Sequence, residues 1–364
     1  MKLLKNLLQY ETFKMVKVKD KRLGLLYRVF QMTIFAYILY TIIANQGYLR
    51  KEAPVEGAVR ISLQAPSTLT APAYCNKLLP CVYWGANEIQ YPPDGAGVAF
   101  VTTRAIVRRY VPPTGCNFLT PSTPTDPCIF NENMSPTQTI TNESYIGDIE
   151  DYTLMIEHSI RGRATSIALR NGIMDGKLMF SDGKTVFKEW TSATRMKDNP
   201  NADGDIIKVS ELLQAAGADL EAPSTAPGAK SGEQYRSSGI VIVIVIEYRN
   251  VKLKKDKFSY KYLPRVIDGN EYKAVESLYQ ADGSYILKER HGIRFVFEQH
   301  GEIGEFSLIS LLENLVAALA LFKVATVLVE ILMLEFLPEK DIYEEAKFEV
   351  TNDLDELRKR SSNH

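Results

Sequence analysis

The chain has 364 residues, of which 43 are Lys or Arg and 44 are Asp or Glu, so its formal net charge is −1. Hydrophobic residues make up 45% of the chain, which permits a sizeable folded core and excludes wholesale disorder. The balanced charge gives no global reason to expect nucleic acid as a partner.

Two long apolar segments lie near opposite ends of the sequence, at 25–44 and 307–337. The first is close to the roughly 20 residues that cross a bilayer as a helix, and Arg28 and Gln31 fall in its first turns, where long side chains reach the interface. The second is longer, which predicts tilt or a partly aqueous extracytoplasmic end. Both are apolar all round, which favours membrane spans over the buried helices of a soluble protein.

Basic residues flank the first span unequally, with seven before it and only Arg50 and Lys51 close behind it. The positive-inside rule therefore predicts a cytoplasmic N-terminus, 1–24, and a second span returns 338–364 to the cytoplasm. The long charged leader and the lack of a small-residue cleavage site favour an uncleaved anchor. Residues 45–306 are then extracytoplasmic. The seven basic residues are Lys2, Lys5, Lys14, Lys17, Lys19, Lys21 and Arg22.

The cysteines agree with an extracytoplasmic region between the spans. All four fall there, which predicts two disulfides, although sequence leaves three pairings open. Two Asn-x-Ser sequons in the same region are expected glycosylation sites. The cysteines are Cys75, Cys81, Cys116 and Cys128, and the sequon asparagines are Asn133 and Asn142.

Strand-like patterns dominate the region between the spans, at 98–110, 152–156, 178–187 and 293–298. The β-branched run 239–246 predicts a strand buried on both faces. Residues 218–238 are rich in Ala, Gly, Pro and Ser, which predicts a mobile loop. The predicted fold class is membrane α + β, in which two transmembrane helices flank one β-rich extracytoplasmic domain.

Short motifs then occur in order along the chain and resemble those of the P2X receptors, a family of trimeric ATP-gated cation channels. Thr12 and Lys14 fall on the family's Thr-x-Lys motif, and Tyr343 and Lys347 fall on its Tyr-x-x-x-Lys trafficking motif. The matching segments are 10–14 (YETFK), 22–28 (RLGLLYR), 100–107 (FVTTRAIV), 151–157 (DYTLMIE), 292–295 (GIRF), 300–307 (HGEIGEFS) and 343–347 (YEEAK).

The resemblance implies a homotrimer that is not an enzyme and needs no cofactor or metal. Extracytoplasmic ATP, with or without a divalent cation, would bind between subunits and open a pore for Na⁺, K⁺ and Ca²⁺. The spans would contact membrane lipid, in the plasma membrane or an intracellular vacuole. The chain has fewer cysteines than animal members carry, which predicts a divergent, non-animal member.

The ligand site implied by the resemblance combines cations with an adenine-binding strand, because a triphosphate needs several convergent cationic donors. Lys288 falls at the family's phosphate-binding lysine, and Lys273 falls at the arginine of its Asn-Phe-Arg motif. Arg60 stands near the position of an absent lysine pair, and Thr153 and Met155 fall where the family contacts adenine. Neighbouring Glu271 has two open interpretations, namely an ion pair with Lys273 or help in holding a divalent ion.

The second span carries the predicted pore, because polar side chains are costly in lipid and usually face a bundle interior or water. Three copies of one glutamate near the extracytoplasmic end would form a cation-attracting ring. Lys323 would oppose cation flux if it lined the pore, so we expect it to pair with Glu330. The predicted pore and gate residues are Glu313, Asn314, Ala317, Ala320, Leu321 and Glu330.

Three alternatives stay open at this point. One is a two-span adhesion or scaffold protein without a pore, and another is a channel of this fold gated by a different ligand. A nucleotide-hydrolysing ectoenzyme is disfavoured by the missing acidic metal cluster. The sequence also contains no Walker A loop, no GxGxxG motif opening a helix, and no Cys or His cluster with zinc spacing, which argues against an enzyme in general.

Overall fold

A computed structural model describes residues 20–53, 56–76, 80–91, 96–120, 123–131, 138–163, 165–191, 194–195, 204–251 and 257–347. The chain divides into two compact units, Met1–Arg50 with Phe306–His364, and Lys51–Glu305. The predicted motif residues Thr12 and Lys14 and the sequon residue Asn133 lie outside the described residues.

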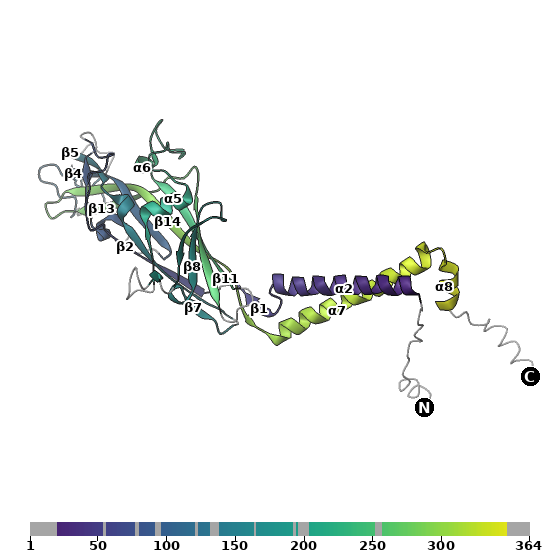
Figure 1. The fold of residues 1–364 in the computed structure, drawn as a ribbon. Helices are drawn as coiled ribbons and strands as arrows, with labels where there is room; N and C mark the ends of the chain where they lie inside the picture. Colours follow the sequence, from purple (N-terminus) through teal and green to yellow (C-terminus); the bar gives the residue numbers. More distant parts are fainter. Residues whose placement is uncertain are drawn as a thin grey trace, which may run out of the picture. The chain divides into compact units, whose positions relative to one another are not determined.

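The first unit is helical. Its two long helices are long and apolar enough to cross a membrane, and they lie side by side (Figure 1). Because only about 6% of each apolar window is buried, neither helix resembles the core helix of a soluble protein. The helices are α2 (Lys21–Ala44), α7 (Leu308–Ile331), its π-helical continuation η3 (Leu332–Phe336), and α8 (Lys340–Lys347).

Capping side chains define where both long helices begin. The Asp20 carboxylate accepts hydrogen bonds from the backbone N–H groups of Arg22 (2.7 Å) and Leu23 (3.4 Å), so α2 starts earlier than the predicted residue 25. The Ser307 hydroxyl accepts a hydrogen bond from the N–H of Ser310 at 3.2 Å and caps α7.

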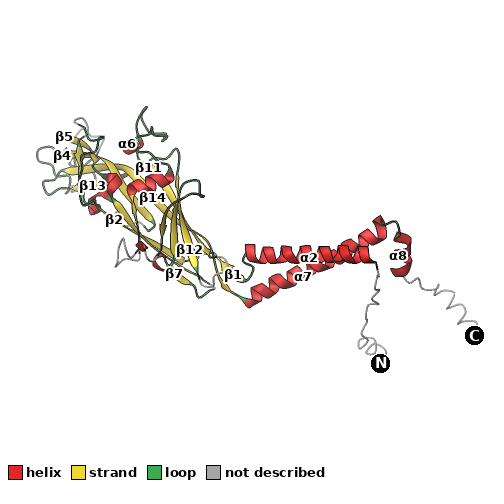
Figure 2. Ribbon diagram, viewed as in Figure 1, coloured by secondary structure: helices red, strands yellow, loops and turns green. Residues whose placement is uncertain are grey.

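The second unit consists mainly of antiparallel and parallel strands with short helices beside them (Figure 2). The larger sheet has the order β3-β5-β4-β14-β11-β12-β8-β9, with β13 paired to β14, and a four-stranded sheet has the order β10-β6-β2, with β7 paired to β6. The strands are β1 (Leu49–Glu52, at the unit boundary), β2 (Glu56–Gln64), β3 (Cys81–Val82), β4 (Val98–Val111), β5 (Gln138–Ile146), β6 (Thr153–Arg161), β7 (Ala168–Arg170), β8 (Asp175–Met179), β9 (Val186–Trp190), β10 (Asp205–Lys208), β11 (Ile240–Asn250), β12 (Phe258–Val266), β13 (Lys273–Tyr279) and β14 (Tyr285–Phe306). The short helices are α3 (Ala86–Ile89), η1 (Ile149–Asp151), η2 (Asn171–Ile173), α5 (Val209–Ala216) and α6 (Tyr235–Ser238).

The core of this unit is centred on β11 and β14, which pair in parallel from Ile240 opposite Ile293. Along β11 the isoleucines are buried, whereas the valines between them are half-buried. The prediction of a strand buried on both faces is therefore correct for one face only. Phe295 on β14 is fully buried in the same cluster, so β11 and β14 together hold the centre of the sheet.

Another prediction from sequence was wrong. The segment 178–187 is not one strand, because a turn at Asp182 and Gly183 divides it into the β8–β9 hairpin, with Gly183 at φ 66°. The segment 218–238, predicted to be a mobile loop, ends in the short helix α6 and contains the buried residues Leu220, Ala226 and Tyr235. Its mobility stays a prediction.

A buried polar network lies beneath the four-stranded sheet. The fully buried Asp205 carboxylate accepts hydrogen bonds from Arg195 (2.8 Å), Tyr262 (2.8 Å) and Tyr260. The Asn171 amide donates to the same carboxylate at 3.3 Å. A buried charge is tolerated only when it is paired and hydrogen-bonded, so this network ties β10 to β12 and to the segment around Arg195.

We predict that Asp205→Ala lowers the free energy of unfolding by about 3–5 kcal/mol, because it leaves the buried Arg195 guanidinium without its counter-ion. Urea unfolding of the full chain in detergent, followed by the fluorescence of buried Trp190, measures this change. Asp268→Asn, in an exposed turn, is the control and should change stability by less than about 0.5 kcal/mol. Equal effects of the two variants would contradict the assigned role of Asp205.

Candidate functional site

The outer face of the four-stranded sheet carries one group of the predicted ligand residues. Along β6, Leu154 and Ile156 point into the core, so Thr153, Met155 and Glu157 between them lie on the outer, half-buried face. This period-two alternation places the predicted adenine contacts, Thr153 and Met155, side by side on that face.

The strand register adds Arg60 to this group. Arg60 lies opposite Glu157 on β2 and β6, with 3.5 Å between its guanidinium and the carboxylate. On the other side of β6, Lys208 lies opposite Thr153. Sequence reasoning missed Glu157 and Lys208, because their positions beside the predicted residues follow from long-range strand pairing. The structure thus brings together Arg60, Thr153 and Met155.

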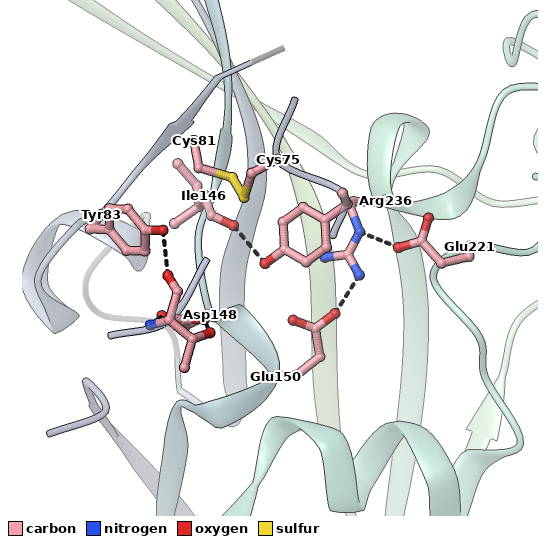
Figure 3. The surroundings of a disulfide bond; sticks show 10 residues. Cys75, Cys81, Tyr83, Ile146, Asp148, Glu150, Glu221 and Arg236 are labelled. Carbon is pink, nitrogen blue, oxygen red and sulfur yellow. Dashed lines mark hydrogen bonds and ion pairs between the residues drawn. A yellow bond between two sulfur atoms is a disulfide. The ribbon is translucent and has the colours of Figure 1, made fainter. Parts of the chain in front are cut away.

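A segment held by the Cys75–Cys81 disulfide supports the start of β6 (Figure 3). The Tyr74 ring lies over the buried Arg236 guanidinium, 3.7 Å from ring centroid to Cζ. Arg236 also binds Glu150 in η1 and donates to Glu221 at 2.6 Å. These contacts tie the turn that precedes Thr153 to the body of the domain.

A second contact of this segment involves Asp148, which adopts the left-handed conformation with φ 57° and is buried. Its carboxylate accepts a hydrogen bond from the Thr70 backbone N–H at 2.6 Å. The Tyr83 hydroxyl donates to the Thr70 carbonyl at 2.5 Å. The turn before β6 is therefore held from two directions, which fixes where its ligand residues lie.

The β13–β14 hairpin carries the other predicted cations. Lys288 pairs with Glu276 at 3.7 Å, and Arg290 binds the same carboxylate at 2.5 Å. One carboxylate thus serves two cations, which leaves surplus positive charge beside Lys288. Lys273 on β13 lies opposite His291 on β14 and shares its face. His291 is three residues after Lys288, and residues an odd number apart on a strand point to opposite faces. The two lysines therefore project from opposite faces of the hairpin.

Two acidic residues near Lys273 have contacts with other residues. Glu289, on the same face of β14 as His291, binds Arg108 at 2.5 Å. The Glu271 carboxylate instead lies over Gly228, where a Cβ atom would be 2.8 Å from its oxygen. The structure therefore separates Lys288 from Lys273 and directs Glu271 toward the 218–238 segment.

The structure selects one of the three disulfide pairings. Cys75 pairs with Cys81 and Cys116 pairs with Cys128, with Cα–Cα distances of 5.3 and 5.1 Å. Asn142 lies exposed on β5, so its side chain is accessible to a modifying enzyme. Its glycosylation stays a prediction.

The faces of α7 differ in what they contact. Ala318 and Ala325 are buried, and α2 is the helix beside them. At 100° per residue, Glu313 and Ala320 fall on the side of α7 opposite the buried alanines, Ala317 lies about a quarter turn from them, and Leu321 lies nearer the buried side. The side chains of these four predicted pore residues are exposed in the single chain.

The remaining residues predicted for the pore have contacts of their own. The Asn314 amide donates to the carbonyl of Gly47 at 2.9 Å and so joins the ends of the two spans. Glu330 pairs with Lys347 at 3.1 Å, so the expected partner Lys323 was wrong. Helical spacing suggested Lys323 as the partner, whereas the turn after η3 returns Lys347 on α8 to Glu330.

Tyr343, the other end of the Tyr-x-x-x-Lys motif, donates a hydrogen bond to the Asp20 carboxylate. This bond raises the pKa of Tyr343 to about 12. Together with the ion pair between Lys347 and Glu330, it joins α8 to both long helices. The sequence motif therefore corresponds to a contact between the ends of the two spans.

Two apolar helices flanking a β-rich domain define an integral membrane protein of the two-span class. The family model "ATP P2X receptor" matches residues 8–144 and 237–350. The chain belongs to the P2X receptor family, whose members are ligand-gated channels.

Curated relatives cover nearly the whole chain. P2X receptor E of Dictyostelium discoideum is 29% identical over 94% of this chain and 88% of its own length. P2X receptor B of the same organism is 32% identical over 95% of this chain and 92% of its own length. Human P2X purinoceptor 5 is 21% identical over 96% of this chain and 83% of its own length. The higher identity to the Dictyostelium proteins agrees with a divergent, non-animal member.

Solved structures confirm the fold. A P2X receptor from the Gulf Coast tick, crystallised with ATP and Zn²⁺, matches with a TM-score of 0.51 at 18% identity, over 85% of this chain and 100% of its own. The chicken ATP-gated P2X7 receptor channel, crystallised with the competitive antagonist TNP-ATP, matches with a TM-score of 0.52 at 17% identity, over 86% of this chain and 99% of its own. At 18% and 17% identity, both similarities show the fold alone.

A buried histidine lies directly behind the Arg60–Glu157 pair. His158 is 2% exposed, and its Nδ1 lies 2.8 Å from the Tyr248 hydroxyl. Within the described residues, its Nε2 has no hydrogen-bond partner. Burial, helped by the nearby Arg195 charge, lowers the pKa of His158 to about 3. The side chain is therefore neutral in the folded protein.

We predict that stability falls as the pH drops below about 6.5, the pKa of an unfolded histidine. Between pH 6.5 and about 3 the unfolded chain binds a proton that folded His158 does not, so the contribution is complete above pH 6.5 and is lost on acidification. At pH 5 the loss is about 2 kcal/mol. Urea unfolding at pH 7.5 and pH 5 measures it, and His158→Leu should reduce the difference, whereas an unchanged difference would contradict this role.

Proposed function

We propose that this chain is a subunit of an ATP-gated, non-selective cation channel that works as a homotrimer. The observation that carries the proposal is the placement of the predicted ligand residues in two different sheets of a chain that belongs to the P2X family. Arg60, Thr153 and Met155 lie on the four-stranded sheet, whereas Lys273 and Lys288 lie on the larger sheet.

A ligand bound between subunits would use both groups, one from each neighbour. The adenine would contact Thr153 and Met155, and the phosphates would be held by Arg60 with Lys288 or Lys273, which project from opposite faces of the β13–β14 hairpin. Arg60 and Lys288 each have a carboxylate nearby, at 3.5 and 3.7 Å, in the free subunit. Weak, partly exposed ion pairs of this kind contribute little, so a phosphate chain with several negative charges can replace them.

The pore in this proposal is lined by three copies of α7. Its exposed face combines Glu313 at the extracytoplasmic end with Ala317 and Ala320, whose small side chains permit close helix approach. This arrangement favours a channel over a two-span scaffold, which has no need of an acidic residue on that face. Na⁺, K⁺ and Ca²⁺ are the proposed permeant ions.

The proposed orientation places both termini in the cytoplasm and Lys51–Glu305 on the opposite side of the membrane. The flanking basic residues and the two disulfides support this orientation. The membrane is the plasma membrane or that of an intracellular vacuole. ATP acts as agonist, alone or with a divalent cation, and a channel of this fold with another ligand is the alternative.

We predict that Lys288→Ala raises the ATP concentration for half-maximal current by about tenfold or more, because it removes a charge-assisted contact to phosphate, and Lys273→Ala tests the opposite face of the hairpin. Whole-cell recording with confirmed surface expression measures this. Lys177→Ala, at a partly exposed lysine of β8 that pairs with Glu189, is the control and should leave the response unchanged.

The outcomes separate the parts of the proposal. Because the two lysines project from opposite faces, a shift in one variant alone would assign the phosphates to that face of the hairpin. If neither variant changes the ATP concentration for half-maximal current, this ligand site is refuted, whereas the channel function still stands. No current in surface-expressed wild type would remove ATP as the agonist.

We also predict that Glu313→Gln lowers single-channel cation conductance by roughly twofold or more at low ionic strength, because it removes three charges that concentrate cations at the pore entrance. Added salt should reduce the difference through screening. Glu345→Gln, on the exposed face of α8, is a matched control. A conductance equal to wild type would argue that Glu313 does not face the pore.

A further inference from the structure

The outer face of the four-stranded sheet contains a hollow that extends beyond the residues assigned so far. It has a volume of about 310 Å³ and is lined in part by Arg60, Glu157, Ser159 and Arg170. A neighbouring hollow of about 570 Å³ shares Ser159 and Arg170 with it, so the two are continuous. Arg170 has no part in the ligand site that the sequence predicted.

The strand register explains why two arginines meet here. Arg60 on β2 lies opposite Glu157 on β6, and Arg170 on β7 lies opposite Ser159, which is two residues further along β6. Residues two apart on a strand share a face, so all four side chains project from the outer face. Glu157 therefore lies between the two flanking strands that carry the arginines.

The charges of the hollow favour an anion. Two guanidinium groups and one carboxylate line it, so cationic side chains outnumber the anionic one in its lining. The pair of Arg60 with Glu157 spans 3.5 Å, and the Arg60 side chain is 78% exposed, so this pair holds Arg60 only weakly. A phosphate chain offers denser negative charge and accepts the planar fork of a guanidinium through two oxygens.

We propose that Arg170 is a second guanidinium that binds the polyphosphate chain of the nucleotide, and that Glu157 competes with the ligand for Arg60 and so weakens binding. The inference rests on the proposed function, because a nucleotide is its ligand. Phosphate approaching from the Thr153–Met155 side meets Arg60 first and then Arg170 along β6. Removal of the Glu157 charge frees Arg60 and removes repulsion of the phosphates.

The test is isothermal titration of the full-length protein in detergent with ATP and, separately, with inorganic triphosphate, which has no base or sugar. Arg170→Ala should raise the Kd for both ligands by about tenfold. Glu157→Gln should lower both by roughly three- to tenfold, and added salt should reduce both effects. Arg163→Ala, an exposed arginine that lines neither hollow, is the control and should leave both values unchanged.

Each contrary result has its own meaning. Unchanged Kd values in Arg170→Ala, or a weakened Kd for ATP but not for triphosphate, would overturn the assignment of Arg170 to the phosphates. An unchanged or higher Kd in Glu157→Gln would overturn the competitor role. The wild-type protein could also bind triphosphate through Arg170 and yet give no current with ATP. This result would support the phosphate site in the hollow and refute ATP as the agonist of the proposed channel.

Discussion

The parallel pairing of β11 with β14 is the constraint on which the rest of the β-rich unit depends. Ile240 and Ile293 begin a buried row that continues along both strands. The same strand β14 pairs with β4 and β13 earlier in its length, and ends at Phe306, immediately before the cap of α7. A single strand therefore passes through the hairpin that carries Lys273 and Lys288 and through the core, and then leads into α7. Slippage of its register would move all three together.

Carboxylates pair with cations in both groups of predicted ligand residues. Glu276 serves both Lys288 and Arg290, whereas Glu157 faces Arg60 in a one-to-one pair. Under the proposed function, a polyanion with several charges would compete with these carboxylates for the cations.

Buried polar networks join parts of the β-rich unit that the disulfides do not. The two disulfides join cysteines only 6 and 12 residues apart, so each closes a local loop. By contrast, Arg236 binds Glu150, 86 residues away, and Asp205 accepts a hydrogen bond from Tyr262, 57 residues away. These buried networks position the turn before β6 and the strand β10, on either side of Thr153.

The sequence by itself determined the two spans and the family. Apolar runs near 25–44 and 307–337 reveal spans without knowledge of any contact, because crossing lipid requires continuous apolar length, and ordered motifs such as 151–157 identify relatives. Only the tertiary structure decided the disulfide pairing, the opposite faces of Lys273 and Lys288, and the pairing of Glu330 with Lys347. These features depend on strand register and chain return, where residues far apart in sequence meet, and local composition carries no record of which of them meet.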